Sequence, residues 1–159
     1  MTPKVINAHI GDVKTGKNND TLQALLGSCI GVGMLWHKKG LYGLAHCLLP
    51  NAPQKTFDID GRYVDQAISS LLALMHVHKD DYFEIEVIVA GGGNMTLPED
   101  TPPESLVGTL NANSAYKMLK ELKLKIVFSD TGGMVGRKIF IDCSSGKYEI
   151  RNIPRKIKK

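Results

Sequence analysis

The amino-acid sequence predicts an α/β fold of the α+β kind, a single domain in which a mixed β-sheet or sandwich core packs against about two main helices. The chain has 159 residues, which suits one domain. Short apolar runs bounded by Gly, Asn and Pro predict several strands. Two other segments carry apolar residues at helical spacing. We expect the domain to cover residues 1–150 and a basic C-terminal tail to cover 151–159.

The first third of the chain is predicted to be mainly strand. Residues 4–10 form a short predicted strand, and the apolar residues 21–26 fit either a strand or one helical turn. The apolar runs 29–36 and 41–49 flank a short polar connection, so we expect them to pair as an antiparallel hairpin in the core. Pro50 ends the second run, because proline cannot donate to the ladder of a central strand.

The rest of the chain is predicted to mix helix and strand. Apolar residues at helical spacing predict a helix from Arg62 to about His78, with Asp60 as its N-cap. A second helix is expected over 114–123, after a loop at 95–110 that is rich in Pro and Thr. Further strands are predicted, in chain order, over residues 84–90, 124–129, 137–143 and 148–153.

Charge and composition exclude several classes of function. The net charge is +4, but five positive charges and no acid lie in 151–159, so the remainder is near −1 (4 − 5). The basic balance therefore describes a solvated tail, and we expect no nucleic-acid partner. No apolar run approaches ~18 residues, so direct membrane insertion is not expected. Three widely spaced cysteines fit a reducing, cytoplasmic location better than a disulfide framework.

Nucleotide and metal sites are not expected either. The glycine-rich stretches VIVAGGGNM and DTGGMVGR lack the spacing of known phosphate-binding loops, so they are interpreted as tight turns and close packing beneath a site. The His and Cys residues show no CxxC or HExxH pair. We therefore expect neither a metal nor an organic cofactor.

Cys29 and His46 are the candidate reactive pair. Cys29 follows Leu26–Gly27–Ser28, a turn of small residues whose backbone N–H groups can form an oxyanion hole. A hairpin that turns near residues 37–40 places Cys29 and His46 roughly opposite each other, because their midpoint is 37.5. Alternation along the strand places Cys47 on the other face, in the core. A histidine beside a thiol lowers the pKa of that thiol and favours nucleophilic catalysis.

The sequence resembles the chemoreceptor glutamine deamidase family, CheD. The pairing of GSC with AHxxLP, with 17 residues from the cysteine to the histidine (46 − 29), is specific to that family. The matching stretches are LLGSCIGV (25–32), GLAHCLLP (43–50), RYVDQAISSLLALM (62–75), VIVAGGGNM (87–95), VGTLNA (107–112) and DTGGMVGRKIFIDCSSGKYEI (130–150).

The resemblance implies a cysteine-hydrolase-like fold and a cysteine hydrolase that converts glutamine side chains of chemoreceptor cytoplasmic domains to glutamate and ammonia. It places the nucleophile at Cys29 and the catalytic histidine at His46. From the turn of small residues itself, we expect the oxyanion-binding amides around Gly27 and Ser28. The family usually has a third catalytic member, a Thr about six residues before the cysteine, where this chain has Gln23. Thr21 is the alternative third member.

Other functions stay open at this point. Thioester chemistry at the same site also fits a methylesterase or another amidase. Loss of the family threonine also fits a weakly active or inactive regulator that binds receptors or a CheC-type phosphatase. The resemblance makes that phosphatase a possible partner of an active enzyme too. In VGTLNA, Leu110 stands where relatives usually carry a basic residue.

Overall fold

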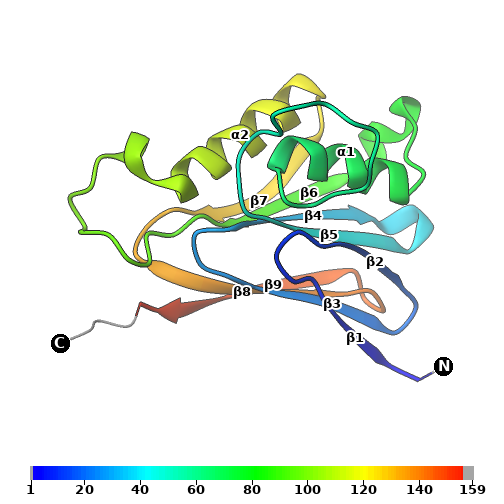
Figure 1. The fold of residues 1–159 in the computed structure, drawn as a ribbon. Coiled ribbons are helices and arrows are strands. Elements are labelled where there is room, and N and C mark those ends of the chain that lie inside the picture. The colour runs from blue at the N-terminus through cyan, green and yellow to red at the C-terminus, as the bar shows by residue number, and fades with distance from the viewer. Residues whose placement is uncertain (1, 156–159) are drawn as a thin grey trace.

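The computed structural model describes residues 2–155 of the chain, and it consists of two stacked β-sheets with a layer of helices on one of them (Figure 1). The four-stranded sheet has the order β1-β3-β8-β9 and the five-stranded sheet has the order β2-β5-β4-β6-β7. The predicted fold class, with a mixed sheet or sandwich core and two main helices, is confirmed.

The strands and helices have the following bounds. The four-stranded sheet consists of β1 (Lys4–Asn7), β3 (Asp20–Leu26), β8 (Val135–Asp142) and β9 (Lys147–Pro154). The five-stranded sheet consists of β2 (Val13–Lys17), β5 (Leu41–Cys47), β4 (Ile30–Trp36), β6 (Glu86–Gly91) and β7 (Lys125–Thr131). The main helices are α1 (Val64–Leu74) and α2 (Val107–Glu121), and the short 3-10 helices are η1 (His37–Lys39), η2 (Lys79–Glu84) and η3 (Pro103–Ser105).

The two faces of the five-stranded sheet bury two separate cores. Ile30 and Val32 of β4 and Cys47 of β5 face α1 and α2. The alternate residues of β4 face the four-stranded sheet, and there a Cβ on Gly33 would come within 2.7 Å of Ile88 and 3.0 Å of Ile141. Gly33 therefore allows the two sheets to approach closely, because only a residue without a side chain fits between the packed layers.

The predicted hairpin between residues 29 and 49 is confirmed, but its predicted register is wrong by two residues. His46 pairs with Gly31, and Cys47 pairs with Ile30. The turn holds the 3-10 helix η1 followed by Gly40 in the left-handed conformation, so it lies one residue later than a turn centred at 37.5. Cys29 is therefore diagonal to His46, two residues before its partner Gly31. An even shift keeps the same face of the sheet.

Both helices differ from their predicted ranges. The first ends at Leu74, because His76 adopts a positive φ of 56° that does not continue a helix. Asp60 is not its N-cap, since the cap position is Tyr63 and Asp60 forms an ion pair with Arg62 instead. The second helix begins at Val107, seven residues before its predicted start.

The C-terminal region is more ordered than a free tail. Strand β9 continues through Pro154, which pairs with Val135. Arg155 donates from Nη1 to the carbonyl oxygens of Asn94 and Leu97. Residues 151–154 thus belong to the sheet, while 156–159 of the predicted tail lie outside the described residues. Within residues 2–155, no helix has the length and apolar composition that membrane crossing requires.

Candidate active site

Cys29 lies in the turn between β3 and β4, and the backbone carbonyls around it are all held by the protein. The carbonyl oxygen of Gly27 accepts from the N–H of Gly93 at 3.0 Å, and that of Cys29 accepts from the N–H of Gly92 at 2.8 Å. The carbonyl between them, on Ser28, accepts from the side-chain amide of Asn111 at 3.3 Å. These bonds fix the orientation of each peptide plane in the turn.

The amide groups of Ser28 and Cys29 point away from those contacts. In a trans peptide the N–H is directed opposite to the preceding carbonyl. The Ser28 amide therefore faces away from Gly93, and the Cys29 amide faces away from Asn111. Neither amide donates to another group in residues 2–155. Two unused N–H donors beside a thiol are what an oxyanion hole requires.

Among residues 2–155, the ring of His46 makes one hydrogen bond. Its Nδ1 lies 2.8 Å from the carbonyl oxygen of Ala8, and the residue is only 4% exposed. A carbonyl can only accept, so the proton resides on Nδ1 and Nε2 presents a lone pair. The backbone of His46 is also fixed, because its N–H donates to Asp12 and its carbonyl accepts from Gly11.

Cys29 and His46 lie on the same side of the five-stranded sheet. Cys29 belongs to the core between the two sheets, where Leu44, two residues before His46, also packs. Cys47 belongs to the other core, beneath the helices, and is fully buried. The prediction that Cys47 faces away from His46 is thus confirmed. Diagonal neighbours in a sheet are about 7–8 Å apart at Cα, within reach of a long side chain such as histidine.

The electrostatics of the pair favour two neutral groups. Burial raises the pKa of the Cys29 thiol above its ordinary value of 9.0. Burial lowers the pKa of His46 below 6.5, although the hydrogen bond to Ala8 and the charge of Asp12 oppose that change. The expectation of a lowered thiol pKa is therefore wrong for the free protein. Near pH 7 the site holds a thiol and a neutral imidazole, which can act as a base toward the thiol.

Gln23 and Thr21 do not orient His46 through their side chains. Leu22 and Ala24 of β3 are buried between the sheets, so the alternate residues Thr21 and Gln23 lie on the opposite face. The Gln23 amide donates from Nε2 to Asn7 at 2.7 Å. In residues 2–155, the hydrogen-bond partner of the His46 ring is Ala8.

Gln23 nevertheless contributes through its backbone. Its carbonyl accepts from the N–H of Ala8 at 2.8 Å, and the carbonyl of Ala8 in turn holds His46. Sequence reasoning did not identify Ala8, because a main-chain carbonyl can be offered by any residue and leaves no signature in the sequence.

The glycine-rich segment at the end of β6, residues 91–93, supports the turn that carries Cys29. Gly91 and Gly92 adopt positive φ values of 107° and 69°, and the amides of Gly92 and Gly93 hold that turn. The interpretation of this segment as a tight turn with close packing is confirmed. A buried arginine, Arg137, donates from Nη1 to the carbonyl of Gly91 and pairs with Asp130 at 3.2 Å. Sequence reasoning missed Arg137, because a lone arginine in a strand is normally exposed.

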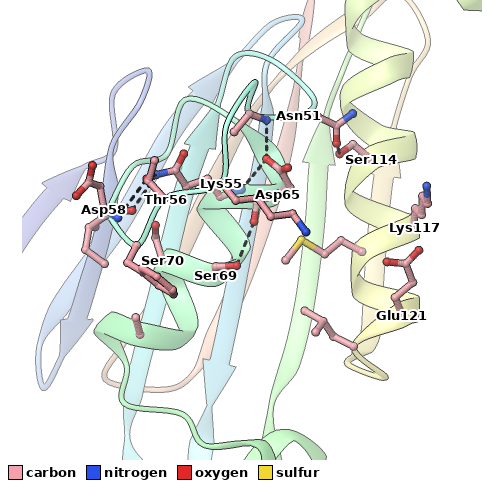
Figure 2. Close-up of a pocket in the computed structure, with 17 residues that line it drawn as sticks. Asn51, Lys55, Thr56, Asp58, Asp65, Ser69, Ser70, Ser114, Lys117 and Glu121 are labelled. Atoms are coloured by element: carbon pink, nitrogen blue, oxygen red, sulfur yellow. Dashed lines mark hydrogen bonds between the residues drawn. The ribbon is translucent and has the colours of Figure 1, made fainter.

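A separate cavity of about 560 Å³ lies on the helical side of the molecule, between the loop 51–59 and the facing sides of α1 and α2 (Figure 2). Neither Cys29 nor His46 lines it. Its charged lining residues are of both signs, Lys55, Asp58, Asp65, Lys117 and Glu121. Across residues 2–155, His, Cys, Asp and Glu side chains form no group of three that could hold a metal ion.

Comparison with known proteins gives a consistent result. Residues 48–152 match the family model "CheD chemotactic sensory transduction". A Ruegeria protein named "Probable chemoreceptor glutamine deamidase CheD 2" is 39% identical, and the match covers 94% of this chain and 93% of the relative. Proteins named "Probable chemoreceptor glutamine deamidase CheD" from Bdellovibrio bacteriovorus and Pyrococcus horikoshii are 34% and 32% identical. Those matches cover 98% and 94% of this chain and 99% and 93% of the relatives.

Proposed function

Because this chain belongs to the CheD family, we propose that it is a protein-glutamine deamidase that acts on the cytoplasmic domains of chemoreceptors. It converts glutamine side chains to glutamate and releases ammonia, and so tunes chemotaxis signalling from the cytoplasm. The observation that carries the proposal is the placement of Cys29 diagonal to His46. Within residues 2–155, the backbone amides of Ser28 and Cys29 donate to no group and the Nε2 of His46 has no hydrogen-bond partner. These are the parts that acyl transfer requires.

The first half of the reaction forms a thioester. The Nε2 of His46 takes the thiol proton as the sulfur of Cys29 attacks the side-chain amide carbon of glutamine. The C–S bond forms, the amide oxygen becomes an oxyanion, and the amides of Ser28 and Cys29 donate to it. The imidazolium then gives its proton to the nitrogen, the C–N bond breaks, and ammonia leaves.

The second half releases glutamate. The neutral imidazole takes a proton from water, and the resulting hydroxide attacks the thioester carbon. The same two amides stabilise the second oxyanion. The C–S bond breaks, the sulfur recovers its proton from His46, and the side chain leaves as a carboxylic acid that ionises. Every proton transfer uses Nε2. The N–H at Nδ1 stays hydrogen-bonded to the Ala8 carbonyl throughout, and this bond stabilises the imidazolium.

The surface beside the site supports a protein substrate. Leu48 and Leu49, which follow Cys47, are 38% and 39% exposed, and Ile10 is 57% exposed next to Gly11, whose amide holds His46. An apolar rim of this kind fits the face of a helix, and a glutamine on that helix would reach the thiol. A CheC-type phosphatase is proposed as a second protein partner, on the basis of family membership alone.

Mass spectrometry of receptor fragments tests the proposal. Chemoreceptor cytoplasmic fragments are incubated with the protein, and each converted glutamine gains about one dalton because NH₂ is replaced by OH. We expect such gains at a small number of glutamines. Tight binding of receptor or phosphatase without any mass change would instead identify a regulator. Loss of methyl groups from methylated fragments, without glutamine conversion, would identify a methylesterase.

A further inference from the structure

Asn111 joins the two chain segments that carry Cys29 and His46. This residue of α2 is fully buried, and its Nδ2 donates to the carbonyl oxygens of Ser28 at 3.3 Å and Leu48 at 3.0 Å. Ser28 directly precedes Cys29, and Leu48 follows His46 by two residues. One side-chain amide therefore ties the start of β4 to the end of β5, at the edge where the site lies.

The other half of the same side chain has no partner. The Oδ1 atom of Asn111 is buried and accepts no hydrogen bond within residues 2–155. A buried acceptor without a donor destabilises the folded state. A residue that only filled space at this position would be apolar, as Ala112 and Ala115 of the same helix are. The contribution of Asn111 to the structure therefore comes from its Nδ2 donor and not from its Oδ1 acceptor.

We propose that Asn111 is a positioning residue for the oxyanion hole, an inference that rests on the deamidase function proposed above. Its bond to the Ser28 carbonyl sets the plane of the Ser28–Cys29 peptide. That plane directs the N–H of Cys29 toward the oxygen of the reacting amide. Asn111 touches neither the substrate nor the reacting atoms, and it acts through this one peptide. Its bond to the carbonyl of Leu48 keeps β5, which carries His46, at a fixed distance from the N–H of Cys29.

A second contact of the same helix supports this assignment. Gly108, one turn before Asn111, packs directly on Gly92, where a Cβ on Gly108 would come within 2.4 Å of the Gly92 oxygen. The amide of Gly92 holds the Cys29 carbonyl. Helix α2 thus fixes the peptides on both sides of Cys29, one through a side chain and one through a close backbone approach.

Two substitutions in α2 test the inference. Asn111→Ala removes the bond to Ser28. Ser114→Ala, one turn later, is the control. It removes a side-chain hydrogen bond to the carbonyl of Pro50, and that carbonyl belongs to no peptide next to Cys29. With receptor fragments as substrate, we expect Asn111→Ala to lower kcat about 10- to 100-fold and to change KM less than about twofold. Ser114→Ala should keep kcat within about twofold of the unmodified protein.

Alkylation of Cys29 distinguishes a misplaced oxyanion-hole amide from a general loosening of the structure around the thiol. Iodoacetamide needs a reactive thiol but no oxyanion hole, so its rate should stay within about threefold in both variants. A large change in alkylation with Asn111→Ala, an unchanged kcat, or an equal loss with Ser114→Ala would overturn the inference. If Asn111→Ala does not fold, Asn111→Ser is used instead, with the same expectations. An unmodified protein that leaves every receptor glutamine unchanged would contradict the deamidase function itself, before any variant is compared.

Discussion

The Nδ1 of His46 lies 2.8 Å from the carbonyl oxygen of Ala8, and this hydrogen bond joins the two sheets of the fold. His46 is on β5 of the five-stranded sheet, whereas Ala8 directly follows β1 of the four-stranded sheet. The Ala8 amide is itself held by the carbonyl of Gln23 on β3. Within residues 2–155, the orientation of the proposed catalytic imidazole is therefore set by strand pairing and by no third side chain.

This arrangement predicts that the side chain of Gln23 is dispensable. We expect Gln23→Ala to keep kcat within about threefold, because the substitution leaves the backbone carbonyl that holds Ala8 in place. His46→Gln should lower kcat by at least about 10²-fold, since it removes the base and acid of both half-reactions. Steady-state deamidation of receptor fragments measures both. Equal losses in the two variants would show that Gln23 acts directly on the imidazole.

The perturbed pKa values predict a particular pH dependence of thiol reactivity. Burial raises the pKa of Cys29 above 9.0, so the rate of its alkylation by iodoacetamide should still be rising at pH 9. Activity should persist below pH 6.5, because the lowered pKa of His46 keeps the imidazole neutral there. Alkylation of the Cys47→Ala, Cys143→Ala double variant isolates Cys29. A rate that levels off below pH 8 would indicate a preformed thiolate.

The same shifts predict how stability varies with pH. The unfolded His46 binds a proton near its ordinary pKa of 6.5 more readily than the folded one, so the free energy of unfolding should fall as the pH drops below that value. The unfolded thiols of Cys29, Cys47 and Cys143 lose protons near 9.0, before the folded ones do. The free energy of unfolding should therefore also fall above pH 9. Urea unfolding at several pH values measures both trends, and greater stability at pH 10 than at pH 8 would contradict the second.

The contact between Gly108 and Gly92 predicts that alanine is harmful at position 108. Alanine is favoured over glycine in a helix by about 1 kcal/mol. However, its Cβ would lie 2.4 Å from the Gly92 oxygen and 2.8 Å from the Gly92 Cα, so backbone must move. We expect Gly108→Ala to lower the free energy of unfolding by about 1–3 kcal/mol and to lower kcat. Thr109→Ala, in the same turn, is the matched control and should be neutral or slightly stabilising in urea unfolding.

Several features of the site could be predicted from the sequence. The apolar runs around HKKG predicted the hairpin, and alternation along the second run placed Cys47 away from His46. The small residues before Cys29 predicted a turn with available amides. These predictions succeed because strand alternation and turn composition are local properties of the chain.

The remaining features depend on contacts between distant segments. The register of the hairpin depended on a helical turn at residues 37–39 that the sequence did not reveal. The start of α2 was missed because Gly108 weakens the helical pattern, and only its packing on Gly92 explains its presence there. The hydrogen bond that orients His46 is accepted by the carbonyl of Ala8, and Asn111 donates to the carbonyl of Ser28. Any residue can supply a backbone carbonyl, so neither bond leaves a signature in the sequence.

The most direct test of this account compares two buried cysteines that lie on opposite faces of the same sheet. Receptor fragments are treated with Cys29→Ala or Cys47→Ala, and glutamine conversion is followed by mass spectrometry, with folding checked by circular dichroism. We predict that Cys47→Ala converts the same glutamines as the unmodified protein, with a loss of about 1 kcal/mol of stability at most. Cys29→Ala should convert none. Conversion that survives in folded Cys29→Ala would contradict the assignment of Cys29 as the nucleophile.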